Sequence, residues 1–264
     1  MTTLGAVCLP MVPPEQLRRL AVTADAAGLD ELWLWEDCFW GGAVPACAAA
    51  LAWTARLRVG VGVLPVPLRN VATAAMDAAM LHRLFPGRVT IGVGHGVESW
   101  MRQTGVAAES PVTLLREYLT ALRALLAGER VTADGRYVHL DDVVLEWPPA
   151  QAPLILTGAI GPRTLRLSGE AADGTVMVAG TAPAEVRRAR ELIAEGQAAG
   201  GRAGEHRLVV YLDVPARDAP AVAAAARGLA EAGADSVVLQ PPQGESDPEG
   251  FVRFTAEQVQ PLLA

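Results

Sequence analysis

The sequence predicts a (β/α)8 barrel, in which eight parallel strands close into a ring and a helix follows each strand. Short apolar runs alternate with helical patterns along the whole chain, eight of each. The length of 264 residues is close to the ~250 typical of this fold. A helix stop, an acidic turn and a strand recur together at 27–30, 171–174 and 232–235, as loops from helix to strand do. A doubly wound sheet is the alternative, although it usually has fewer strands at this length.

The elements of the first half follow from apolar runs and from helix start signals. Val-rich or Leu-rich runs of the kind that parallel sheets bury are expected as strands at Leu4–Leu9, Glu31–Trp35, Leu57–Leu64 and Val89–Val93. Segments that begin at Pro or Asn and carry a helical apolar face are expected as helices at Pro13–Ala27, Pro45–Ala55, Asn70–Leu84 and Val112–Ala127.

The segment 131–149 interrupts the alternation. Asp134-Gly135 lies between two short runs rich in β-formers, and this dipeptide is a hairpin turn signal. We therefore expect a hairpin inserted outside the main sheet.

The second half resumes the alternation. Strands are expected at Leu154–Leu156, Thr175–Val178, Leu208–Leu212 and Ser236–Leu239. Helices are expected at Pro162–Ala172, Pro183–Gln197, Ala219–Ala232 and Pro248–Leu263. We expect one barrel domain over residues 1–264.

The composition excludes several classes of function. A net charge of −7 with no basic run argues against nucleic-acid binding, and the absence of lysine excludes Schiff-base enzymes. The longest uncharged window is broken by Gly and Pro, and its helical part would span about 16 Å against a hydrocarbon core of ~30 Å, so no membrane association is expected. The N-terminus lacks a signal-peptide pattern, and Cys8, Cys38 and Cys47 form no C-x-x-C or metal spacing. We expect a cytoplasmic protein with free thiols and no metal site.

The active site of a (β/α)8 barrel lies on the loops that follow the strands. Two of these loops in the sequence carry polar side chains and are therefore candidates. Asp37 and Trp40 follow the second strand, and Gly94, His95 and Glu98 follow or end the fourth. We expect Asp37, Trp40, His95 and Glu98 as candidate catalytic residues. As an alternative, Asp37 is only a helix cap and Trp40 only an aromatic that covers the loop. The alternative for the loop with Gly94 and His95 is a simple glycine turn.

Two later loops combine small residues with a following proline. Gly158, Ala159, Gly161, Pro162 and Arg163 form one, and Ala179, Gly180 and Thr181 form the other. Bare amides at a helix N-terminus bind anions, so we expect these adjacent loops to hold a phosphate. A tight loop with an exposed arginine is the alternative.

Four segments together resemble the bacterial luciferase-like superfamily, and more narrowly its branch that uses the deazaflavin coenzyme F420: residues 58–69, 87–94, 153–163 and 169–174. The resemblance implies a barrel, often a homodimer, with the cofactor lying across its mouth. It implies an F420-dependent oxidoreductase that transfers a hydride between the deazaflavin and a small organic substrate. An FMN-dependent monooxygenase and a non-catalytic flavin-binding barrel stay open as alternatives.

The resemblance also assigns residues. It implies a bulge with a cis peptide bond between Gly62 and Val63 behind the ring. Separately, the glycines after the fourth strand let the backbone approach a ligand closely, so we expect Gly94 by the cofactor. Main-chain contacts to the cofactor are implied for Gly158, Ala159 and Gly161, and a phosphate loop at 179–181.

Three departures from the family pattern concern the proton donor and the phosphate. Cys38 stands where many relatives have histidine, and the acid Glu98 comes one residue later than in some. Thr181 stands where some have lysine, which leaves Arg163 or backbone amides to neutralise a phosphate. The proton donor therefore stays open among Asp37, His95 and Glu98.

Overall fold

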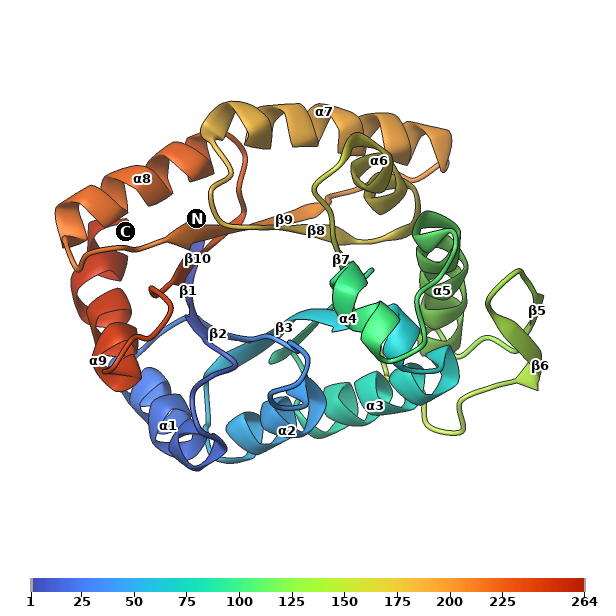
Figure 1. Cartoon of the computed structure of the whole chain (residues 1–264), viewed down its shortest axis with the longest axis horizontal. Helices are drawn as coiled ribbons and strands as arrows, with labels where there is room; N and C mark the ends of the chain where they lie inside the picture. Colours follow the sequence, from blue (N-terminus) through green and yellow to red (C-terminus); the bar gives the residue numbers. More distant parts are fainter. Residues whose placement is uncertain (1, 264) are drawn as a thin grey trace.

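The computed structural model describes residues 2–263 and folds them into a closed barrel, as Figure 1 shows. The strands close in the order β1-β10-β9-β8-β7-β4-β3-β2, and every pairing in the barrel is parallel. Their bounds are β1 Thr3–Cys8, β2 Glu31–Leu34, β3 Arg58–Pro65, β4 Val89–Gly94, β7 Ile155–Gly158, β8 Gly174–Met177, β9 Arg207–Asp213 and β10 Ser236–Gln240. The predicted (β/α)8 fold is confirmed. One domain over 1–264 stays a prediction, and its two end positions lie outside the described residues.

Helices surround the barrel and bury its outer face (Figure 1). The main ones are α1 Leu17–Ala27, α2 Ala43–Ala52, α3 Val71–Leu84, α5 Pro111–Leu126, α6 Pro162–Ala171, α7 Pro183–Ala199 and α8 Ala219–Glu231. Short 3-10 turns, η1 Pro14–Gln16 and η2 Val66–Leu68, precede α1 and α3. Between residues 2 and 263, none of the helices combines the length and the apolarity needed to pass through a bilayer.

The helices differ from the predicted ones in two places. A short helix, α4 Glu98–Gln103, was not predicted because only Met101 on it is buried and the segment has no apolar face. The predicted helix 248–263 divides into α9 Pro248–Arg253, a π-helix at Phe254–Val259 and a 3-10 turn at Gln260–Leu262. Pro261 has no N–H, so an α-helical hydrogen bond cannot form there.

The hairpin is present as a separate two-stranded sheet of β5 Val131–Asp134 and β6 His139–Val143, as predicted. Its turn is longer than the predicted Asp-Gly turn. The Glu117 carboxylate, from α5, accepts hydrogen bonds of 2.9, 2.8 and 3.1 Å from the amides of Arg136, Tyr137 and Val138. A Cβ on Gly135 would lie 2.5 Å from that carboxylate, so the glycine is what allows its approach. A distant side chain, rather than the local dipeptide, organises this turn.

Two apolar layers hold the barrel. Trp33 and Trp35 belong to the cluster inside the barrel, whereas Leu32 and Leu34 pack in the outer layer beneath the helices. The strand alternation predicts this division. The inner layer matters for function because it closes the barrel below its mouth.

A buried carboxylate closes the opposite end of the barrel. Glu31 is almost fully buried, is ion-paired with Arg207, and accepts a 2.9 Å hydrogen bond from the Trp33 indole. Arg58 lies 3.6 Å from the same carboxylate. Charges at the amino-terminal end of barrel strands usually serve stability, and this network has that form.

Candidate active site

The strand ends at the mouth form a floor around one side chain, Val63. A Cβ on Gly94 would lie 2.7 Å from Val63, one on Gly92 2.9 Å, and one on Gly158 3.5 Å. These glycines come from β4, which pairs with β3, and from β7, which pairs with the other side of β4. The structure therefore brings the predicted residues Val63, Gly94 and Gly158 together, and the glycines leave the space that Val63 occupies.

A bulge in β3 places Val63 there. The register between β3 and β4 shifts between Val61 and Leu64, and the peptide bond between Gly62 and Val63 is cis. The bulge and cis bond implied by the resemblance are confirmed as geometry. The role of Gly62 and Val63 in cofactor binding stays a prediction.

Tyr211, which the sequence did not single out, supports the bulge from inside the barrel. Its hydroxyl donates a 3.2 Å hydrogen bond to the Gly62 carbonyl, and its ring packs on Trp33 and Trp35 at centroid distances of 6.0 and 5.5 Å. Burial raises the pKa of Tyr211, so the hydroxyl stays protonated and remains a donor.

The first glycine-rich loop leads to an uncapped helix. Gly161 is the N-cap residue of α6 and supplies no side-chain cap, and Pro162 occupies the first helical position. The amides of Arg163 and Thr164 in this first turn are the groups that an α-helix leaves without internal partners. Gly161 and Arg163 are exposed, and Ala159 is buried against the barrel. An anion can reach these amides.

The second loop differs because its helix already has a cap. The Glu185 carboxylate accepts a 2.7 Å hydrogen bond from the Ala182 amide at the start of α7, and the Thr181 hydroxyl bonds a backbone carbonyl three residues earlier at 2.7 Å. Gly180 turns the chain with a φ of 82°. A carboxylate already at this end competes with a phosphate, so α6 offers the better anion site of the two.

The loop after β2 contains two acids with different surroundings. Glu36 is buried, ion-paired with Arg69, and accepts a 2.9 Å hydrogen bond from the Ala43 amide at the start of α2. Asp37 is half-buried and no hydrogen bond to its carboxylate is present within residues 2–263, and burial raises its pKa. Glu36 therefore holds the loop, while no described side chain or amide engages the Asp37 carboxylate.

The residues after Asp37 form the rim of the mouth. The bond between Cys38 and Phe39 is cis, and burial together with the Glu36 and Asp37 charges raises the pKa of the Cys38 thiol. Phe39 and Trp40 are 67% and 63% exposed, so Trp40 does not cover the loop as a packed aromatic would.

The fourth loop separates its two predicted residues. His95 is half-buried with Nε2 3.5 Å from the Thr164 hydroxyl, and burial lowers its pKa. Glu98 on α4 is 77% exposed on its side chain and pairs with Arg102 at 2.6 Å. His95 thus lies beside the first turn of α6, whereas Glu98 forms a surface i,i+4 pair.

A family model described as luciferase-like monooxygenase matches residues 2–257. The chain belongs to this family. It is 30% identical over 201 residues to a 5,10-methylenetetrahydromethanopterin reductase of Methanolobus tindarius, an alignment covering 76% of this chain and 61% of the relative. It is 34% identical over 182 residues to an F420-dependent glucose-6-phosphate dehydrogenase of Kineococcus radiotolerans, covering 63% of this chain and 53% of the relative. The matched part thus spans between half and two thirds of these relatives' lengths.

Solved luciferase-like structures share the fold along the whole chain. An F420-dependent secondary alcohol dehydrogenase in complex with an F420–acetone adduct has a TM-score of 0.88 at 19% identity, covering 100% of this chain and 99% of that one. A type II Baeyer–Villiger monooxygenase from Pseudomonas putida in complex with FMN has a TM-score of 0.78 at 16% identity, covering 98% of each chain.

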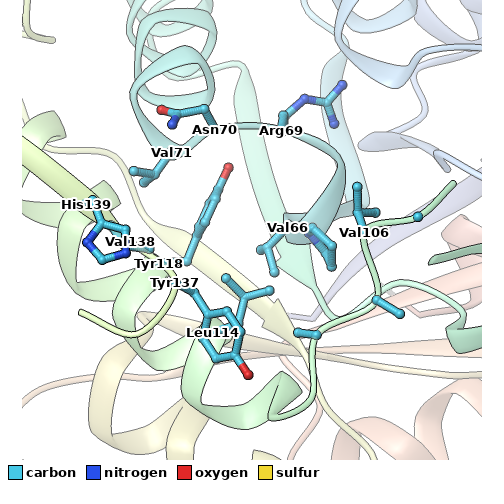
Figure 2. Close-up of a pocket in the computed structure, with 14 residues that line it drawn as sticks. Val66, Arg69, Asn70, Val71, Val106, Leu114, Tyr118, Tyr137, Val138 and His139 are labelled. Atoms are coloured by element: carbon cyan, nitrogen blue, oxygen red, sulfur yellow. The ribbon is translucent and has the colours of Figure 1, made fainter. Parts of the chain in front are cut away.

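A groove on the outer side of the luciferase-like barrel lies apart from the residues predicted for the site. It has a volume of about 420 Å³ between the start of α3, α5 and the hairpin. Figure 2 shows the Tyr118 hydroxyl pointing toward Arg69 and Asn70, while the Arg69 guanidinium turns away from the groove. None of the residues predicted for the site lines it. Along the described chain there is no cluster of three or more metal-ligating side chains.

Proposed function

We propose that this luciferase-like protein is an F420-dependent oxidoreductase that transfers a hydride between the deazaflavin and a small organic substrate. The resemblance of four segments to the F420 branch supports this, as do the two curated relatives, one of them named as F420-dependent. The observation that carries the proposal is that the Val63 floor and the uncapped first turn of α6 occur together at the mouth. A cofactor with a flat ring and a phosphate-bearing side chain needs a surface for the ring and a binding site for the phosphate.

The residues present fit such a group. Val63 and the glycines around it would support the ring, and the amides of Arg163 and Thr164, with the Arg163 guanidinium, would hold the phosphate. When bound, the deazaflavin supplies a ring carbon that gives or takes the hydride. The protein's own residues hold the ring and exchange the proton.

Asp37 is the proton donor or acceptor that we propose. Its carboxyl has a raised pKa, which brings it closer to the pH at which proton transfer is efficient. The lowered pKa of His95 favours a neutral ring at pH 7, and the exposed Glu98 is paired with Arg102. Both nevertheless remain candidates for the same role.

Titration of the purified protein with F420 and with FMN, followed by fluorescence, tests the proposal. We expect tighter binding of F420, and tighter binding of FMN would instead assign the protein to the flavin monooxygenases that the family description and the FMN-bound neighbour represent. Tight F420 binding with no turnover on any ketone, alcohol or imine would favour a non-catalytic cofactor-binding barrel.

Paired variants test the phosphate site. Gly161→Asp places a carboxylate at the uncapped N-terminus of α6, and we expect at least about a fivefold loss of F420 affinity, since a competing charge there is worth about 1 kcal/mol or more. Ala182→Asp adds the same charge to α7, which Glu185 already caps, and should change affinity little. Equal losses in both variants would contradict the assignment to α6.

We also propose that two copies associate through α3 and that the protein acts in the cytoplasm. Met76, Met80 and Leu84 form an exposed apolar stripe at four-residue spacing along α3, and stripes of this kind mark protein contacts. Free thiols at all three cysteines suit a reducing compartment. Sedimentation should give a dimer that Met80→Glu dissociates, and a monomeric parent would refute the contact.

A further inference from the structure

A large apolar hollow lies between α1 and α2, where the chain leaves β1 and β2. Its volume is about 570 Å³, within the range of small-molecule sites, which is ~300–1,000 Å³. No side chain that lines it carries a charge, and its walls include Leu9, Met11, Leu17, Phe39, Ala46 and Trp53. A charged group placed there would lose its hydration without gaining a partner.

The hollow borders the mouth through Trp35. This side chain lines the hollow and also packs on Tyr211 in the inner cluster beneath the mouth. Leu9 likewise belongs both to the hollow's wall and to the inner cluster. A molecule in the hollow therefore contacts Trp35, whose ring packs on Tyr211, the residue that supports the Gly62–Val63 bulge.

The rim of the hollow is exposed, and the loop that carries it is held by polar contacts of Glu36. Phe39 and Trp40 line the opening and keep most of their surface in solvent. The loop carrying them is fixed by Glu36, through its ion pair with Arg69 and its bond to the Ala43 amide. Large aromatic side chains held in solvent at the edge of an apolar hollow mark a ligand-binding site.

We propose that this hollow binds the apolar part of the substrate, and that the substrate is an uncharged organic compound carrying an extended hydrocarbon or aryl group. Its polar, reacting end would lie at the mouth beside Trp35 and Asp37. The inference rests on the proposed function for the identity of the reaction, but the binding itself does not require the cofactor.

Binding of a homologous series tests the proposal without turnover. Trp35, Trp40 and Trp53 line the hollow, so tryptophan fluorescence can report the binding of 2-hexanone, 2-octanone and 2-decanone to the full chain. Burying one CH₂ contributes about 0.8 kcal/mol, so each added methylene should lower Kd about fourfold and each step of the series about fifteenfold. A Kd independent of chain length would overturn the proposal.

Two variants locate the site. Ala46→Phe fills the hollow and should abolish the dependence of Kd on chain length, whereas Ala26→Phe adds the same bulk at an exposed position of α1 outside the lining and should preserve it. Unchanged dependence in Ala46→Phe would refute the location. A change in sedimentation with Ala46→Phe, accompanied by no ketone binding to the parent, would show that a second copy covers the hollow and would also refute the proposal.

The same samples separate this inference from the proposed function. F420 affinity is measured independently of the ketones. F420 binding without ketone binding overturns the inference alone, and ketone binding without F420 binding supports the inference while it overturns the proposed function.

Discussion

Gly62→Ala should be among the most damaging small substitutions in this protein. A Cβ at this position would lie 2.1 Å from the Tyr211 hydroxyl oxygen and 2.9 Å from the Trp33 ring, and both rings are buried. Overpacking of a filled core costs about 1–3 kcal/mol, and displacing the Tyr211 hydroxyl from the Gly62 carbonyl costs about 1 kcal/mol more. We therefore expect the free energy of unfolding to fall by about 2–4 kcal/mol and F420 affinity to fall with it.

Urea denaturation of a double-mutant cycle checks the reasoning. Tyr211→Phe removes the atom that the new Cβ meets first, so the double variant should be more stable than the sum of the two single changes by at least about 1 kcal/mol. Gly41→Ala is the matched control, because no described atom lies within 4 Å of its added Cβ and the residue caps no helix. It should change stability by less than about 0.5 kcal/mol. Additivity of Gly62→Ala and Tyr211→Phe within about 0.5 kcal/mol would refute the proposed clash.

Three further predictions follow from buried or free titratable groups. Glu31→Ala leaves the buried Trp33 indole without its acceptor and the half-buried Arg207 without its carboxylate partner. It should cost about 3–5 kcal/mol in urea unfolding, and an unchanged midpoint would contradict that role. Burial lowers the pKa of His206 to about 4 from 6.5, so its stabilising contribution is complete above pH 6.5 and is lost as the pH falls toward 4. The free energy of unfolding should fall by about 3 kcal/mol over this pH range in the parent but not in His206→Gln. An equal pH dependence of stability in parent and variant would contradict this role of His206. Asp37→Asn should lower turnover ~10²- to 10⁴-fold with F420 affinity unchanged, and a larger loss in His95→Ala would move the acid to His95.

The barrel could be predicted because its signals are local and repeated. Inward Trp33 and Trp35 and outward Leu32 and Leu34 follow from alternation alone. The hairpin was predicted from Asp134-Gly135, but the geometry of its turn could not be, because it depends on Glu117 on α5, a contact between segments distant in sequence. Local propensity is overridden wherever a side chain from another element supplies the hydrogen bonds.

The candidate site likewise has parts that the sequence predicts and parts that only the structure shows. Its glycine floor and small-residue loops are readable as motifs, whereas Tyr211 is one apolar-facing residue of an ordinary strand and carries no signal of its own until the bulge of β3 is in place. The difference between the two phosphate loops was readable. Glu185 lies three residues after Ala182, the spacing at which an acid caps its own helix, and no acid stands at the equivalent position after Gly161.

The adjacent acids Glu36 and Asp37 show how one loop can serve both structure and chemistry. Glu36 has its charge neutralised by Arg69 and its second oxygen engaged by the Ala43 amide, so it cannot take part in proton exchange without releasing the loop. Asp37 has no such partner within residues 2–263, and burial raises its pKa. Two carboxylates with different environments take different roles, and here the environment of the first fixes the position of the second. The missing histidine at Cys38 therefore does not remove the proton donor from this loop, because the acid that we propose stands one residue earlier.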